Sequence, residues 1–321
     1  MSNFIVVPLD GSAVANAAIP HAAELARRTQ TGLHVITVHR PVNPVVSADS
    51  LVYLPDPQLD IELQEQARAW LMKRAAEIRV ETGLPVTAEF RIGPVVEEIC
   101  AAAAARDTRL IVCTTHGAGG WGLHWIGSIA DGLIRNAPCP VLAMSEAAVK
   151  RPVTVKKMLI LLDGSAVSAA ILPPARWLAH AFGATVDLLR VASPPWFGET
   201  LLRPDSTIAD RFDVDGYARM AKEALDEAAA NLRSDGLTVT SMVNVDTDTV
   251  HAILERITLA DPDIVALATH GRGISRLFVG SISDKVLRTS SRPTLCLRPQ
   301  DVVETPERVP RYDSLFAGAA V

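Results

Sequence analysis

The sequence predicts an α/β protein built from two tandem, doubly wound, five-stranded parallel sheets with helices on both faces. Valine- and isoleucine-rich runs alternate with longer alanine- and leucine-rich stretches, which is the pattern of buried parallel strands covered by helices. The length of 321 residues is enough for two domains. A series of short motifs also occurs twice in the same order. Together these observations indicate a duplicated domain.

The repeat is easiest to see at its start, where FIVVPLDGSAV at 4–14 returns as KMLILLDGSAV at 157–167. Further on, Thr115-His116-Gly117 matches Thr269-His270-Gly271, and Gly127-Ser128 matches Gly280-Ser281. Several blocks in one order, at a nearly constant offset, are not expected by chance. The expected domains are therefore residues 1–146 and 156–299, with 147–155 as a linker and 300–321 as a C-terminal tail.

Each copy is expected to alternate strands and helices. In the first copy the β-branched runs predict strands at 4–9, 33–39, 86–91, 109–115 and 140–144, and the intervening stretches predict helices at 13–30, 59–82, 95–105 and 127–136. The second copy predicts strands at 157–162, 185–191, 238–244, 263–269 and 293–298. Pro20 and the Pro173-Pro174 pair interrupt helical patterns, so a kink or restart is expected at each.

Charge and cysteine usage exclude several classes of function. The net charge of −5 and pI of about 5.9 disfavour nucleic-acid binding, which usually needs a basic face. The four cysteines form no CxxC pair and fall mainly in apolar runs, so we expect free buried thiols. The N-terminus reads as a strand rather than a signal peptide, and no apolar run is long enough to span a membrane. A cytoplasmic protein is expected.

Two places in each copy carry residues suited to ligand binding. In open α/β sheets, ligands bind beyond the carboxyl ends of the strands where the strand order reverses. The first strand is followed by Asp10-Gly11-Ser12 in one copy and by Asp163-Gly164-Ser165 in the other. The aspartate either caps the following helix or accepts hydrogen bonds from a nucleoside. Its repetition opposite a glycine-rich loop favours the ligand interpretation.

The second place is the loop after the fourth strand, which ends in Gly127-Ser128 or Gly280-Ser281. The free N–H groups at the start of the next helix, with the serine hydroxyl, suit a phosphate oxygen, although an ordinary N-cap serine remains the alternative. Residues 117–122 spell GxGxxG, but that dinucleotide motif belongs after the first strand. No Walker-type phosphate loop is present.

These residues resemble the universal stress protein family over about residues 3–298. The family's ATP-binding loop has two residues between its first glycines, nine before the next glycine, and then serine or threonine. The resemblance implies a Rossmann-like fold of the adenine nucleotide alpha hydrolase type. It assigns Asp10 and Asp163 to the nucleoside and the backbone at Val38 and Val191 to adenine.

The loop positions implied for ribose and phosphate differ from the family pattern in both copies. They are Thr114, Gly117, Gly127 and Ser128 in the first copy, and Ala268, Gly271, Gly280 and Ser281 in the second. Thr114 and Ala268 replace the loop's first glycine, adding a Cβ where the backbone would meet the ligand. The first loop keeps nine residues but has no basic side chain; the second has Arg272 and Arg276 but only eight residues.

The sequence thus predicts a tandem stress-response protein that binds ATP or a related adenine nucleotide, with or without Mg²⁺, in one or both halves. No nucleophile–base set accompanies the motifs, so efficient turnover is not expected. Two alternatives stay open. One is an interaction protein whose altered loops no longer accept nucleotide; the other is a slow ATPase using Asp131 or Asp284. We expect the two copies to pack through last-strand or helix surfaces as an intramolecular pseudo-dimer. A further homodimer is left open.

Overall fold

The computed structural model describes residues 3–41, 45–46, 52–53, 57–115, 126–193, 214–269 and 281–299. The first half alternates strands with helices, as the repeat predicts. Its elements are β1 (Phe4–Pro8), α1 (Ala13–Asn16), α2 (Ile19–Thr29), β2 (Gly32–His39), α3 (Pro57–Thr82), β5 (Val86–Ile92), α4 (Val95–Ala104), β6 (Thr108–Thr114), α5 (Ser128–Asn136) and β7 (Val141–Met144). A two-stranded antiparallel pair, β3 (Val45–Val46) and β4 (Val52–Tyr53), lies within the β2–α3 connection.

The second half repeats this order after a connection that contains the short helix α6 (Glu146–Val149). Its elements are β8 (Lys157–Leu161), α7 (Ala166–Ala169), α8 (Leu172–Phe182), β9 (Thr185–Ala192), α10 (Val214–Ser234), β10 (Val239–Val245), α11 (Thr249–Ala260), β11 (Ile264–Ala268), α12 (Ser281–Thr289) and β12 (Thr294–Leu297). All four cysteines of the chain are free thiols, and Cys113 and Cys296 are buried.

The predicted helix at 13–30 is divided into α1 and α2, as Pro20 suggested. Pro20 occupies the first turn of α2, where proline's missing N–H would have had no partner within the helix. Ser12 begins α1 by accepting the Ala15 N–H at 3.1 Å, and Ser165 caps α7 through the Ser168 N–H at 3.0 Å. The same sequence signals therefore produce the same local structure twice.

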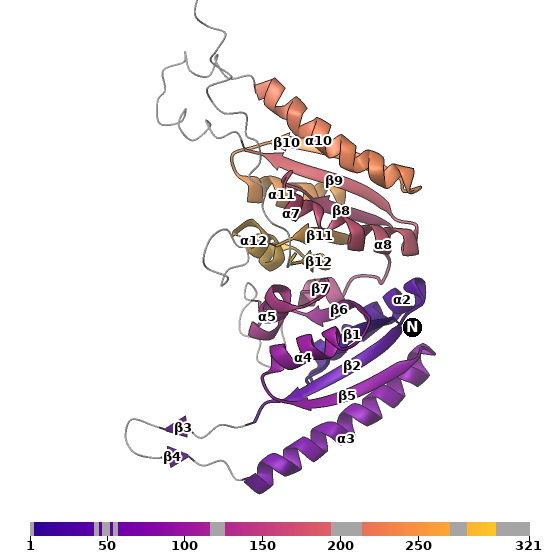
Figure 1. Ribbon diagram of the computed structural model, residues 1–321, viewed down its shortest axis with the longest axis vertical. Coiled ribbons are helices and arrows are strands. Elements are labelled where there is room, and N and C mark those ends of the chain that lie inside the picture. The colour runs from indigo at the N-terminus through magenta and orange to yellow at the C-terminus, as the bar shows by residue number, and fades with distance from the viewer. Residues whose placement is uncertain are drawn as a thin grey trace, which may run out of the picture.

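Both halves have the strand order expected of a doubly wound fold, but their sheets are not separate. The strands form one ten-stranded sheet in the order β10-β9-β8-β11-β12-β7-β6-β1-β2-β5. Pairing is parallel within each half and antiparallel between β7 and β12. Figure 1 shows these two strands at the centre of the elongated molecule. Each half would otherwise leave its last strand as an open edge, and pairing the two edges satisfies their backbone groups.

The register at this junction shows how the halves are related. Leu142 lies opposite Leu295, its own counterpart in the repeat. Thr294 lies opposite Ala143 and Cys296 opposite Val141, so counterparts exchange places across the pair. This reciprocal pairing is that of a two-fold axis, the relation found in symmetric dimers.

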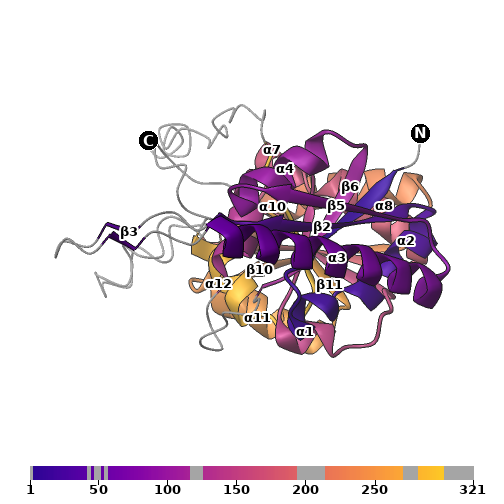
Figure 2. The same cartoon turned by 90° about the horizontal axis from the view of Figure 1, so that it is seen from below.

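The helices cover the two faces of the shared sheet and bury two hydrophobic layers. One layer includes buried residues of α2, α3, α8 and α10. The other includes buried residues of α4, α5, α11 and α12. Seen from below, α3 and α4 lie on opposite sides of β2 and β5 (Figure 2). Because both faces are covered, the strand ends and the loops that follow them are left for ligands.

Candidate functional site

The strand order reverses between β1 and β6 in the first half and between β8 and β11 in the second. In each half, the two strands whose following loops carry the predicted motifs are direct hydrogen-bonded neighbours. The carboxyl ends of neighbouring parallel strands lie at the same edge of the sheet. The structure therefore brings the aspartate turn and the end of the fourth strand together twice.

The aspartate turn of the first half presents its carboxylate to solvent. Asp10 is exposed, and its Oδ1 accepts the Ser12 N–H at 2.9 Å. Gly11 between them has φ of +84°, a conformation that favours glycine. One carboxylate oxygen thus stabilises the turn that precedes α1. The helix-cap interpretation of Asp10 was wrong, because Ser12 is the N-cap of α1 and Asp10 stabilises the turn before it. The ligand interpretation stays a prediction.

The turn of the second half repeats this geometry but has an arginine over it. Asp163 Oδ1 accepts the Ser165 N–H at 2.8 Å, and Gly164 has φ of +93°. The guanidinium of Arg190, from β9, lies so close to Gly164 that a Cβ there would overlap it. The counterpart of Arg190 is Thr37, which is buried and donates to the Leu9 carbonyl at 2.8 Å.

Arg190 was missed by the sequence reasoning. The repeat alignment contains the signal, since Arg190 directly precedes Val191 as Thr37 precedes Val38. Val38 and Val191 themselves lie near the ends of β2 and β9, half-buried against the hydrophobic layer on the α4 and α11 face. Their backbone positions are thus at the strand-end edge where the resemblance puts adenine.

The glycine-rich loop of the first half is closed at its base. The Gly127 N–H donates to the Thr115 carbonyl at 2.6 Å, so the start of α5 lies beside the end of β6. Gly127 is the N-cap of α5 and has no side chain with which to cap the helix, and Ser128 is exposed. The first N–H groups of this nine-residue helix are donors suited to an anion.

Not every predicted site residue is described. Gly117, Gly271 and Gly280 lie outside the described residues, as do the three histidines of the loops and Arg272 and Arg276. Ser281 opens α12. Of the two residues that replace the loop's first glycine, Thr114 is half-buried at the end of β6 and Ala268 is buried at the end of β11.

The acidic residues considered for metal binding are already paired. Asp131 accepts two hydrogen bonds from Arg135, at 2.8 Å each. Its counterpart Asp284 accepts from Arg288 Nε at 2.7 Å, and this bond raises the pKa of Arg288. Among the described residues there is no group of three or more His, Cys, Asp or Glu side chains placed to hold a metal ion.

Cys113, in the strand that leads into the first loop, is not a candidate nucleophile. Cys113 lies in β6 beside Thr114, and burial alone raises its pKa to about 12. Because the thiolate is the reactive form, this side chain is part of the core. In the described part of the chain, no helix is long and apolar enough to span a bilayer.

Comparison with known proteins supports the duplicated architecture. The chain is 27% identical over 311 residues to universal stress protein Rv2623 of Mycobacterium tuberculosis, covering 92% of this chain and 96% of that protein. It is 30% identical over 145 residues to universal stress protein MJ0531 of Methanocaldococcus jannaschii, covering 44% of this chain and 81% of that protein.

A crystal structure of a universal stress protein from Archaeoglobus fulgidus matches the fold with a TM-score of 0.68, at 18% identity, covering 93% of this chain and 99% of that one. The model of the universal stress protein family matches residues 1–145 and again residues 154–298. The chain therefore belongs to the universal stress protein family, as a tandem of two such domains.

Proposed function

We propose that this protein binds ATP or a related adenine nucleotide at the strand-end edge of its sheet and acts in the stress response without efficient turnover. One observation carries the proposal. The start of α5, which has no side-chain cap, is hydrogen-bonded to the end of β6 through Gly127 and Thr115. β6 pairs with β1, the strand that precedes Asp10. Anion donors and a nucleoside acceptor thus follow neighbouring strands.

The residues fit the nucleotide without a catalytic set. Asp10 would accept hydroxyl or amino hydrogens of the nucleoside, and the α5 N–H groups with Ser128 would hold phosphate. Mg²⁺ would accompany the phosphates where it is bound. Asp131 is engaged by Arg135, which argues against the slow-ATPase alternative. We propose the cytoplasm as the setting, because adenine nucleotides are abundant there. We also propose that the two halves act as an intramolecular pseudo-dimer.

The aspartate can be tested without disturbing its turn. Asparagine keeps a carbonyl oxygen for the Ser12 N–H, so Asp10→Asn and Asp163→Asn preserve the Asx-type hydrogen bond while removing the charge. Equilibrium dialysis with labelled ATP should show that Asp10→Asn weakens binding by roughly tenfold, equivalent to about 1.4 kcal/mol, with no change in the midpoint of thermal unfolding.

The matched control is Asp226→Asn, which removes an exposed-face carboxylate that pairs with Lys222 on α10 and should leave ATP affinity unchanged. Failure of the unmodified chain to bind ATP at millimolar concentration would contradict the proposal. In that case the interaction-protein alternative, which the side chains of Thr114 and Ala268 favour, would take its place.

We further infer that the first half is the tighter site. The Arg190 guanidinium lies over Gly164, the residue that follows the aspartate proposed to accept nucleoside hydrogens. A ligand in the second half must displace the Arg190 guanidinium. The first half has the uncharged Thr37 at the corresponding position, so a ligand there displaces no cation. If Arg190 instead binds the phosphates of the nucleotide, the second half is the tighter site.

The two roles of Arg190 are separated by Arg190→Thr in a chain that also carries Asp10→Asn, which weakens the first site so that the second site becomes the tighter of the two. ATP binding to that site should become tighter by roughly tenfold, measured by isothermal titration. Weaker binding in the double variant would show instead that Arg190 is a ligand of the nucleotide.

A further inference from the structure

A groove runs beside α8 where the second half meets the first. Its walls include Arg109, Pro140, Pro173, Trp177, His180 and Leu297, and it has a volume of about 920 Å³. We call it the α8 groove. It lies at the opposite end of the first half's strands from Asp10, because Arg109 and Pro140 are at the amino ends of β6 and β7. It is therefore separate from the first half's proposed nucleotide site.

The two-fold relation of the halves gives this groove a counterpart beside α2. Pro20 is the counterpart of Pro173 and Glu24 that of Trp177, and both line the space beside α2. There the β7–β8 connection, residues 145–156, passes through. Two smaller spaces remain beside α2, with volumes of about 20 Å³ and about 370 Å³, and Val153 lines both of them. The counterpart is thus largely filled by the chain's own connection.

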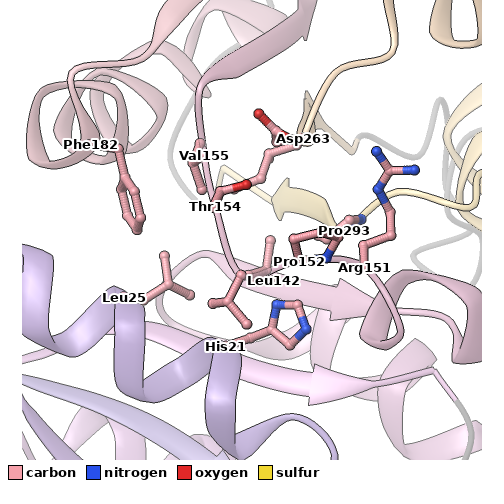
Figure 3. A pocket seen from close by; sticks show the side chains of 12 residues that line it. His21, Leu25, Leu142, Arg151, Pro152, Thr154, Val155, Phe182, Asp263 and Pro293 are labelled. Carbon is pink, nitrogen blue, oxygen red and sulfur yellow. The ribbon is translucent and has the colours of Figure 1, made fainter.

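The connection is held there by specific contacts. The buried His21 ring of α2 lies with Nε2 3.1 Å from the Val149 carbonyl. The Lys156 N–H donates to Asp263 Oδ2 at 2.7 Å, and Val155 is buried. Figure 3 shows Pro152, Thr154 and Val155 passing between the α2 side chains and those of the second half. A segment that contains proline and valine and turns along the groove is therefore what this kind of groove accepts.

The segment that corresponds to this connection in the second half is residues 300–321. The connection follows β7, the last strand of its half, and residues 300–321 follow β12, the last strand of the other. Leu297, at the end of β12, already lines the α8 groove. The 22 residues can span up to about 70 Å when extended, so the whole groove is within reach.

The composition of this segment suits the groove. Val302-Val303, Pro306 and Val309-Pro310 repeat the proline and valine content of the connection's RPVTV at 151–155. Trp177 offers an apolar surface where α2 has Glu24, whose carboxylate pairs with two arginines. We propose that the C-terminal segment, residues 300–312, binds in the α8 groove as the intramolecular counterpart of the β7–β8 connection.

Limited trypsin digestion of the full chain tests the proposal, because the segment has two cleavage sites, after Arg308 and after Arg311. Trp177→Ala and His180→Glu should each speed cleavage at these sites by about tenfold, since cleavage follows the population of the unbound segment. Lys73→Glu, an exposed charge reversal on α3, is the control and should leave the rate unchanged. Circular dichroism confirms that each variant folds. Equal rates in the wild type and both groove variants would overturn the proposal.

A second measurement does not depend on the stability of any variant. A photo-crosslinking phenylalanine analogue introduced at Arg176, an exposed residue in the same groove, should couple to residues 300–312, as mapped by mass spectrometry. Mixing ¹⁵N-labelled and unlabelled chains distinguishes the segment of the same chain from that of a second copy. Coupling within one chain supports the proposal; coupling only between chains, or to no part of the segment, overturns it.

Discussion

His34 is a buried residue whose protonation links the stability of the fold to pH. Its side chain is fully buried in β2, with Nδ1 2.8 Å from Thr87 Oγ1 and Nε2 3.2 Å from Glu89 Oε2. Burial lowers its pKa to about 4, helped by the charges of Arg106 and Arg91 and opposed by Glu89. The folded protein therefore holds His34 neutral at neutral pH.

The sign of the pH effect follows from this shift. In the unfolded chain a histidine has a pKa near 6.5, so between pH 6.5 and about 4 the unfolded state binds more protons. The stability associated with neutral His34 is complete above pH 6.5 and is lost as the pH falls towards 4. Urea unfolding should show a smaller loss over this range for His34→Gln than for the wild type. His251→Gln, on an exposed side chain, should follow the wild type.

Part of this cluster could have been found from the repeat. Thr87 and His34 correspond to Thr240 and Asp187, and in the second half the Thr240 hydroxyl donates to Asp187. A polar pair on the same two strands of each copy is visible in an alignment of the halves. The same alignment does not show that Glu89 and Arg106 contact the first pair, because those contacts depend on the directions of side chains that come from separate segments.

At the scale of the elements, strongly patterned segments were predicted well. The expected helices at 59–82, 95–105 and 127–136 match α3, α4 and α5 to within two residues. α4 and α5 bury regular apolar stripes, whereas α3 buries one only in its second half, at Leu71, Ala75 and Ile78. The helix α6 was missed within the expected linker. Four residues are too few to show a period, and the signal was only Ser145, whose Oγ accepts the Ala148 N–H at 3.3 Å. The β3–β4 pair was missed for the same reason.

The candidate site was predicted less completely than the fold. The aspartate turns and Gly127 lie where the motifs placed them, since strand order alone fixes their edge of the sheet. Arg190 was not foreseen, because a strand arginine looks like any exposed residue until its neighbour Gly164 is known. The assignment of individual positions to adenine, ribose and phosphate stays a prediction.

At the scale of the whole molecule, the junction of β7 and β12 was not foreseen as one continuous sheet. Leu142 and Leu295 are both buried there and lie opposite each other. Replacing either with alanine should lower the free energy of unfolding by about 2–5 kcal/mol. Because the side chains are cross-strand neighbours, the double variant should differ from the sum by about 0.5–3 kcal/mol.

Urea unfolding of the two single variants and the double variant measures this coupling. The control pair is Leu295→Ala with Leu33→Ala. Leu33 is buried in β2, with three strands between it and β12, so its effect should simply add to that of Leu295→Ala. Additivity in both pairs would mean that the junction side chains do not interact.

The domain boundaries at 146 and 156 stay predictions.

The reciprocal pairing of Leu142 with Leu295 has a consequence for how such a chain can evolve. Two identical, separate copies that paired through this edge would dissociate on dilution. A substitution in the edge strand would also occur in both copies, and so on both sides of the two-fold axis. Joined by the twelve residues 145–156, the partners see each other at an effective concentration of the order of millimolar. Each half can then change independently, so one can keep a ligand while the other places an arginine over the same turn.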